Sequence, residues 1–283
     1  MTHPNRRLSE NRRMLVNRRL LVPALMASFV ATACTTSTDS DSSAASTSPQ
    51  ASASPTPSPT PIADAAVRAV PAAQWQRIQD AGMVGKGCPI TSPDQLRRVE
   101  INHHGFDGKI HRGMIVVNAD TAKTVARVFT KLFDEKFPIR QMKPLEEYGG
   151  DNTASLAANN TASFNCRRPD QINAPALESP HANGRAVDIN PLVNPWKDLR
   201  CKCWKPKAEY NARTEGQGKI LEGGSVWQTF IDEGWIWQNI DVPDYMHFDT
   251  GYPSKPYAGP GTSAPPGTNT GTSASPGADA GAP

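Results

Sequence analysis

The chain of 283 residues carries 30 lysines and arginines against 27 aspartates and glutamates, a formal net charge of +3. Six arginines against Glu10 alone give residues 1–33 a charge of +5, which leaves about −2 for residues 34–283. The basic balance therefore belongs to the N-terminus and gives no reason to expect a nucleic-acid partner. Between two tails of biased composition about 190 residues remain, enough for one domain with a hydrophobic core.

The N-terminal segment, residues 1–33, predicts a signal peptide of the lipoprotein type. Its arginine-rich start leads into an apolar run over residues 20–31, which is too short to span a bilayer. The small residues that follow precede Cys34 and resemble a bacterial lipobox, so we expect cleavage before Cys34 and lipid on its thiol. Such an anchor places the protein at the outer face of the cytoplasmic membrane, with secretion to the cell wall as the alternative. The arginine pairs leave both Sec and twin-arginine export open.

Two further segments predict disorder. Residues 34–63 consist mainly of Ser, Thr, Ala, Pro and Asp, and residues 253–283 repeat this composition with more glycine. Segments with few large apolar side chains cannot bury enough surface to offset the entropy of ordering. We therefore expect a disordered linker over 34–63, a folded domain over 64–252 and a disordered tail over 253–283.

The first half of the predicted domain mixes helices and strands. Pro71 begins a short helix that Gly82 ends, and Ser92 caps another. The clearest helix, over residues 120–136, has one apolar stripe at three- and four-residue spacing. Strands are predicted over residues 99–102, 113–117 and 138–142, with turn residues between the first two.

The second half continues without strict alternation of helix and strand. Residues 186–189 form a short apolar run that reads as a buried strand, and residues 194–219 are polar and irregular, which indicates a surface insertion. Ser225-Val-Trp-Gln228 predicts a capping box for a helix that Gly234 ends. The last strands are predicted over 235–237 and 245–249. This order of elements indicates an α+β fold, a single compact domain with a small antiparallel sheet flanked by helices.

Four cysteines remain after Cys34, an even number that usually forms disulfides in an exported protein. We favour a bond between Cys88 and Cys166, because Cys201 and Cys203 both lie in the insertion. Those two could close a small ring or belong to a separate zinc ribbon, and the connectivity of all four cysteines stays open.

The segment 179–191 holds the strongest chemical signal. Asp188 lies within the apolar run, and burying an unpaired carboxylate costs several kcal/mol, so Asp188 requires a cation or several donors. The turn-forming pair Asn183-Gly184 would fold His181 back beside it. Far downstream, His247 follows Asp244 by three residues. Two imidazoles and one carboxylate are the three-ligand set of a catalytic zinc site that leaves a fourth position open for water.

The paired motifs Ser179-x-His-x-x-Gly-x-Ala-x-Asp188-Ile-Asn-Pro191 and Asp244-Tyr-Met-His-Phe248 resemble the zinc peptidase family of D-alanyl-D-alanine carboxypeptidases and L-alanyl-D-glutamate endopeptidases, whose fold is shared with the zinc site of Hedgehog signalling domains. The resemblance spans roughly residues 85–250. It implies one zinc ion per chain, with His181, Asp188 and His247 as ligands. It also implies Asp244 as the catalytic base and Arg167 as the arginine that holds substrate.

Two departures from the family pattern concern specificity. Asn183 stands where an aromatic residue is usual, and Gln238-Asn239 replace a glycine pair. Asp249, just past His247, could orient an imidazole from behind.

The resemblance predicts a zinc-dependent peptidase that hydrolyses peptidoglycan stem or cross-link peptides. Its base is an aspartate, as in the family's L-alanyl-D-glutamate endopeptidases, so we favour that activity. The alternatives are a D-alanyl-D-alanine carboxypeptidase and a zinc-containing wall-binding lipoprotein without catalysis. The expected partners are the peptidoglycan peptide and, through Cys34, the membrane, and we expect a monomer that binds no nucleic acid.

Overall fold

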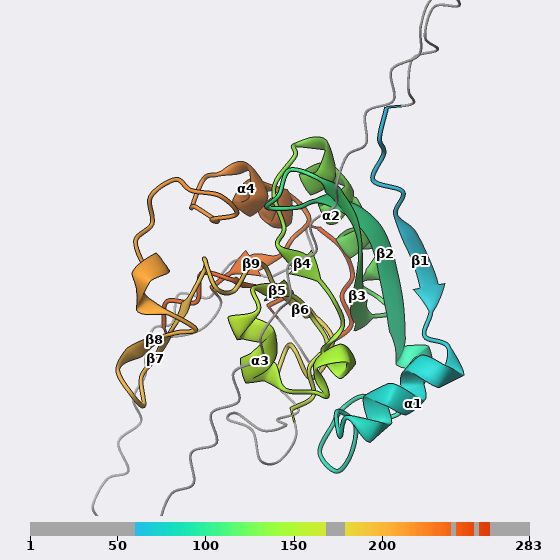
Figure 1. Cartoon of the computed structure of the whole chain (residues 1–283). Helices are drawn as coiled ribbons and strands as arrows, with labels where there is room; N and C mark the ends of the chain where they lie inside the picture. Colours follow the sequence, from blue (N-terminus) through green and yellow to red (C-terminus); the bar gives the residue numbers. More distant parts are fainter. Residues whose placement is uncertain (1–59, 168–178, 239–241, 252–254, 261–283) are drawn as a thin grey trace, which may run out of the picture. The chain divides into compact units, whose positions relative to one another are not determined.

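The computed structural model describes residues 60–167, 179–238, 242–251 and 255–260. It confirms the predicted α+β fold (Figure 1). The signal peptide, Cys34 and nearly all of the linker and tail lie outside the described residues, so those predictions stay predictions. Across the described ranges, none of the helices is both long and apolar enough to cross a membrane.

The first sheet has the order β1-β2-β3 and is antiparallel throughout. Its strands are β1 (Ala66–Ala69), β2 (Leu96–His104) and β3 (Ile110–Asn118). β2 and β3 pair over their full length, so both exceed the predicted strands by several residues. Helix α2 (Ala122–Asp134) packs on this sheet with its apolar stripe, as the spacing predicts (Figure 1).

The second sheet, in the order β6-β10-β9, carries the residues of greatest interest. It consists of β6 (Ala186–Asp188), β10 (His247–Asp249) and β9 (Ile236–Trp237), all antiparallel. Helix α4 (Ser225–Asp232) contributes Phe230, whose ring stacks on that of Phe248 with centroids 4.0 Å apart. One buried apolar cluster includes residues of both sheets, of α2 and of α4, so the second sheet rests on the same core as the first.

The remaining elements are short. They are α1 (Ala72–Asp80), α3 (Asn152–Ala157), the parallel pair of β4 (Gln141–Met142) and β5 (Asn160–Thr161), and the antiparallel pair of β7 (Trp196–Asp198) and β8 (Cys203–Lys205). Turns of 3₁₀ helix cover Pro93–Gln95, Leu145–Tyr148 and Ala208–Tyr210. The strand predicted over 138–142 is thus reduced to its last two residues.

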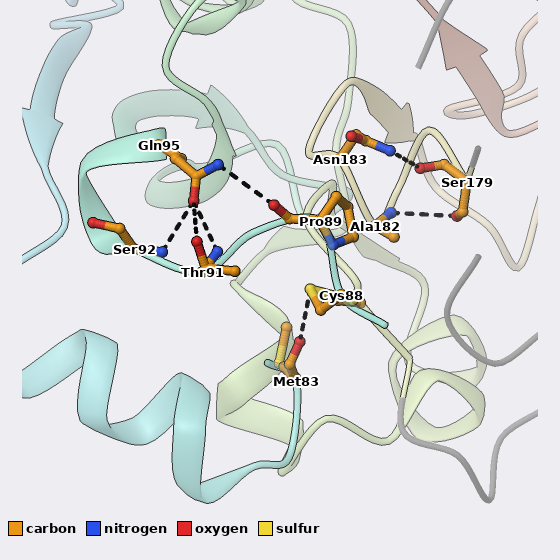
Figure 2. The surroundings of a disulfide bond; sticks show 10 residues. Met83, Cys88, Pro89, Thr91, Ser92, Gln95, Ser179, Ala182 and Asn183 are labelled. Carbon is orange, nitrogen blue, oxygen red and sulfur yellow. Dashed lines mark hydrogen bonds between the residues drawn. A yellow bond between two sulfur atoms is a disulfide. The ribbon is translucent and has the colours of Figure 1, made fainter. Parts of the chain in front are cut away.

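The capping box lies elsewhere than predicted. Gly224 is the N-cap of α4 and Ser225 is already helical, without a capping hydrogen bond. The box is formed instead by Ser92, whose hydroxyl accepts from the Asp94 amide, and Gln95, whose Oε1 accepts from the Ser92 amide at 3.0 Å (Figure 2). A glycine before Ser225 can adopt the extended cap conformation itself, so the serine is not needed there.

The insertion over 194–219 is more than the irregular surface segment predicted. Asn194 is fully buried, and its Nδ2 donates to the carbonyls of Ile189 and Gly218. Arg213 donates to the carbonyls of Val193 and Tyr210 at 3.0 and 2.6 Å. These polar side chains satisfy backbone carbonyls inside the fold, which is why a polar sequence can still pack.

Two disulfides lie within the described residues. The predicted bond between Cys88 and Cys166 is confirmed and joins residues 78 apart (Figure 2). It ties the segment after α1 to the segment that leads to Arg167. The pairing that the sequence left open is a bond between Cys201 and Cys203, across the β7–β8 hairpin.

A buried polar pair joins α1 to the turn before α3. Gln74 Nε2 donates to Glu146 Oε1 at 2.7 Å, while Gln74 Oε1 and Glu146 Oε2 are buried and find no hydrogen-bond partner among the described residues. Burial raises the pKa of Glu146, and the bond from Gln74 only partly opposes this shift. A protonated carboxyl would close the second bond, from Glu146 Oε2 to Gln74 Oε1.

Glu146→Gln is expected to raise the free energy of unfolding at pH 7.5 by about 1 kcal/mol, because the new amide donates to Gln74 Oε1 without a proton being taken up. The folded pKa of Glu146 lies above its unfolded value, so the wild type loses stability as the pH rises from the unfolded pKa through the folded one. The variant should lack this loss. Urea denaturation at pH 5 and pH 7.5 measures both effects, with the exposed Glu147→Gln as control. A Glu146→Gln protein less stable than wild type at pH 7.5 would contradict the pairing.

Candidate metal centre

His181 lies in a tight turn that its own neighbours hold. The Ala182 amide donates to Ser179 Oγ at 3.3 Å, and Asn183 Nδ2 donates to the Ser179 carbonyl at 2.9 Å (Figure 2). The predicted turn is therefore present. Asn183, which departs from the family pattern, is buried and serves to close this turn.

Gly184 fixes where the turn sits. Its φ is +68°, and a Cβ there would lie 2.7 Å from the backbone nitrogen of Asn118 at the end of β3. The Asn118 amide donates to the Gly184 carbonyl at 2.7 Å. Only glycine allows both this conformation and this approach, so the turn is attached to the first sheet.

The pairing of β6 with β10 brings Asp188 and His247 together. The two residues are direct partners in the antiparallel register. On its other side Asp188 forms an isolated bridge with Ala162, whose amide donates to the Asp188 carbonyl at 3.1 Å. Backbone hydrogen bonds on both sides thus position this carboxylate before any ligand is considered.

Three donor atoms face one another at the centre of this arrangement. His181 Nε2 lies 3.0 Å from His247 Nδ1, and both nitrogens lie 3.2 Å from Asp188 Oδ1. Ligand atoms about 2.0–2.1 Å from a tetrahedral zinc ion are separated by about 3.3 Å. The three side chains therefore fit a zinc ion both in the type of ligand atom and in the spacing between these atoms.

The far nitrogen of each imidazole is held by an oxygen. His181 Nδ1 lies 2.8 Å from the Ser163 carbonyl, which can only accept, so Nδ1 carries the proton. His247 Nε2 lies 3.0 Å from Asp249 Oδ2. Each ring is thereby held with its other nitrogen toward the centre, the arrangement that metal-binding histidines use. The predicted role of Asp249 behind His247 agrees with this contact.

The charged forms of Asp188 and His247 stabilise each other at the centre. Burial alone would raise the pKa of Asp188, but the two imidazoles outweigh it and hold the pKa well below its usual range. Burial alone would lower the pKa of His247, and its bonds to Asp188 and Asp249 raise it well above the ordinary value instead.

Asp244 lies in the loop that leads into β10. Its amide donates to Gln238 Oε1 at 3.1 Å, and its carbonyl accepts from the His247 amide at 3.2 Å. Burial raises the pKa of Asp244 to about 7. Its Oδ1 is buried and has no hydrogen-bond partner among the described residues. Gln238, the second departure from the family pattern, thus supports this loop, a role the sequence did not reveal.

Arg167 is near the same carboxylates. Burial lowers the pKa of its guanidinium, and the charges of Asp188 and Asp244 oppose that shift. The adjacent Cys166 forms the disulfide to Cys88, so the chain is covalently held just before this arginine. All five predicted site residues of the domain therefore converge, while Cys34 lies outside the described residues.

A small polar pocket opens beside the centre. With about 10 Å³ of free space it has room for one water-sized group, and both His181 and Asp188 line it. Two more of its lining residues, Ser163 and Asn165, present the buried atoms Oγ and Oδ1 without hydrogen-bond partners among the described residues. Neither side chain stood out in the sequence, because single polar residues within a strand-like segment carry no periodic signal.

Comparison with known families finds one match, in the second half of the domain. Residues 173–250 match a family described as D-alanyl-D-alanine carboxypeptidase. The matched segment contains His181, Asp188, Asp244 and His247 but begins after Arg167. No curated protein and no solved structure matches the chain.

Proposed function

We propose that this chain is a zinc-dependent peptidase that hydrolyses peptidoglycan stem or cross-link peptides, because residues 173–250 match the family described as D-alanyl-D-alanine carboxypeptidase. The bond we favour is that between L-alanine and D-glutamate. The observation that carries the proposal is the meeting of three candidate metal-ligand atoms with a buried carboxylate, Asp244, whose Oδ1 has no hydrogen-bond partner in the part of the chain that the structure describes.

In this proposal His181, Asp188 and His247 hold one zinc ion per chain. Zinc in such a site acts as a Lewis acid that polarises a carbonyl and lowers the pKa of water. The Ser163 carbonyl and the Asp249 carboxylate keep the two imidazoles oriented toward it. A divalent cation would also favour the ionised form of Asp244, whose pKa burial otherwise raises.

Asp244 then acts as the general base. It accepts a proton from the attacking water and returns it to the leaving amine. Arg167, which interacts with the charges of Asp188 and Asp244, offsets the negative charge that develops on the scissile carbonyl oxygen. Gln238 holds the loop of Asp244 through the backbone, so the base keeps its place relative to His247.

Digestion of purified peptidoglycan followed by mass measurement of the products tests the proposal and selects the bond. Release of stem peptides that lack L-alanine is the expected result, because the base is an aspartate, as in the L-alanyl-D-glutamate endopeptidases that the motifs resemble. Loss of a single D-alanine would instead identify a D-alanyl-D-alanine carboxypeptidase. The absence of any product with zinc-loaded protein would sink the enzymatic proposal and favour a wall-binding lipoprotein.

We also propose that lipid on Cys34 anchors a monomeric protein at the outer face of the cytoplasmic membrane. Cys34 follows an apolar run and small residues in the pattern of a lipobox. Wild type should sediment with membranes, whereas Cys34→Ser should not be processed normally. Equal amounts of both proteins free in the medium would indicate ordinary secretion to the cell wall.

A further inference from the structure

The β7–β8 hairpin concentrates positive charge that the proposed chemistry does not use. Residues 196–207 contain five basic side chains and one acidic one, in a chain whose residues after the N-terminal segment sum to about −2. The basic residues are Lys197, Arg200, Lys202, Lys205 and Lys207. A cluster of positive charge on a chain whose remaining charge is slightly negative favours the binding of an anionic partner. Solubility alone would not require the positive charges to be gathered in one hairpin.

The five cations differ in their ion pairs. Asp198 pairs with Arg200 at 2.8 Å and with Lys205 at 3.7 Å, and these neighbours lower its pKa to about 2. Lys197 and Lys202, in contrast, form no ion pair with any described carboxylate. Lys202 is exposed and Lys197 is half-buried along Trp204, with its Nζ 5.3 Å from the ring centroid. The charge of Lys202 is therefore open to a partner, and that of Lys197 is shared with an aromatic ring but neutralised by no described carboxylate.

The tip of the hairpin holds Lys202 in an unusual conformation. Its φ is +54°, which is uncommon for a residue with a Cβ, and the disulfide between its two neighbours closes the chain around it. Glycine or asparagine would adopt this backbone at less cost. Backbone strain of this kind is often found at functional positions, so the Lys202 side chain at the closed tip of the hairpin is a candidate binding residue.

The hairpin is fixed to the loop that carries Asp244. Trp196 forms a β-bridge with Asp244, and the Lys197 amide donates to the Pro243 carbonyl at 2.8 Å. The ring of Trp204 stacks on that of Tyr245 with centroids 5.3 Å apart. Whatever binds the hairpin is therefore held next to the metal centre.

We propose that the β7–β8 hairpin binds the carboxylates of a polyanionic wall polymer and so delivers its peptides to the metal centre. The proposal rests on the proposed function, which supplies a polymer whose stem peptides carry such carboxylates. An anionic membrane fits the surface less well. Leu199 is the one large apolar side chain that the hairpin exposes among the described residues, and Trp196 and Trp204 are covered by Arg200 and Lys197.

The test measures binding without hydrolysis. The full chain carrying Cys34→Ser and Asp244→Asn is mixed with insoluble purified peptidoglycan, and the bound fraction is followed with increasing salt. Lys197→Gln with Lys202→Gln should weaken binding by roughly ten-fold. Lys109→Gln with Lys123→Gln, the same charge change at two exposed lysines outside the hairpin, should leave it unchanged. Peptidoglycan whose carboxylates have been converted to neutral amides should no longer bind.

Equal binding by the two double variants would overturn the proposal, and so would undiminished binding to amidated peptidoglycan. Tighter binding to phosphatidylglycerol vesicles than to peptidoglycan would also overturn it and would assign the hairpin to a membrane. Because hydrolysis is not measured, failure here leaves the peptidase proposal standing. Conversely, a protein that binds through the hairpin but never cleaves would refute only the proposed catalysis.

Discussion

Asp244→Asn is expected to reduce hydrolysis of peptidoglycan peptides by roughly a hundred- to ten-thousand-fold, the range typical for loss of a general base. The substitution keeps the shape of the side chain and leaves the backbone bonds to Gln238 and His247 in place. Folding and zinc content should therefore be unchanged. Initial rates with muropeptides, together with metal analysis of the same samples, measure both expectations.

Asp134→Asn serves as the matched control, since Asp134 is an exposed residue of α2 and its change removes the same charge. It should retain the wild-type rate. If Asp244→Asn cleaves within about three-fold of wild type, some other group accepts the proton and the assignment of the base is wrong. If wild type itself does not cleave and both proteins bind peptidoglycan equally, the chain is a binding module.

His247→Ala should lose most of the zinc, whereas wild type should retain about one equivalent per chain after dialysis. His247 supplies one of three facing donor atoms, and removing it leaves two ligands, too few for tight binding. Metal analysis of the purified proteins measures this, and the exposed His111→Ala is the control. Similar zinc content in the two variants would show that the ion is bound elsewhere.

His247→Ala also leaves the carboxylates of Asp188 and Asp249 without their common partner, and uncompensated buried charge can cost about 3–5 kcal/mol. A second variant avoids that risk of unfolding. Asp249→Asn keeps all three ligand atoms and weakens only the support of His247, so zinc affinity should fall about ten- to a hundred-fold. Unchanged zinc affinity in Asp249→Asn would mean that this contact does not position the ligand.

Local sequence was sufficient wherever neighbours along the chain decide the structure. The stripe on α2 specified a helix and its buried face because the members of such a stripe lie within a few turns of one another. The turn at His181 could likewise be predicted, since Asn183 and Gly184 close it within six residues. Helix capping was harder, because both Ser92 and Ser225 begin plausible boxes and only the backbone shows which serine caps.

Contacts between segments far apart in the sequence could be predicted only from the family resemblance, and some could not be predicted. Gln238 and Asp244 meet because β9 and β10 lie in one sheet, and neither residue shows this in its surroundings. The polar insertion was predicted to be irregular, yet its buried Asn194 and Arg213 bond carbonyls far from them in sequence. Polar composition indicates exposure on average, and tertiary hydrogen bonds override it residue by residue.

By itself, then, the sequence indicated the α+β class and, together with family resemblance, the identity of the three candidate ligands, because unusual residue types at distinctive spacings limit the alternatives; it favoured Cys166 as the partner of Cys88 without settling the connectivity. Only the tertiary structure decided that the ligand atoms of His181, Asp188 and His247 face one another at 3.0–3.2 Å with their tautomers held from behind. It alone also placed the cationic hairpin beside Asp244. The reason is physical: strand register and side-chain burial depend on the free energy of packing distant segments together, which no short stretch of sequence contains.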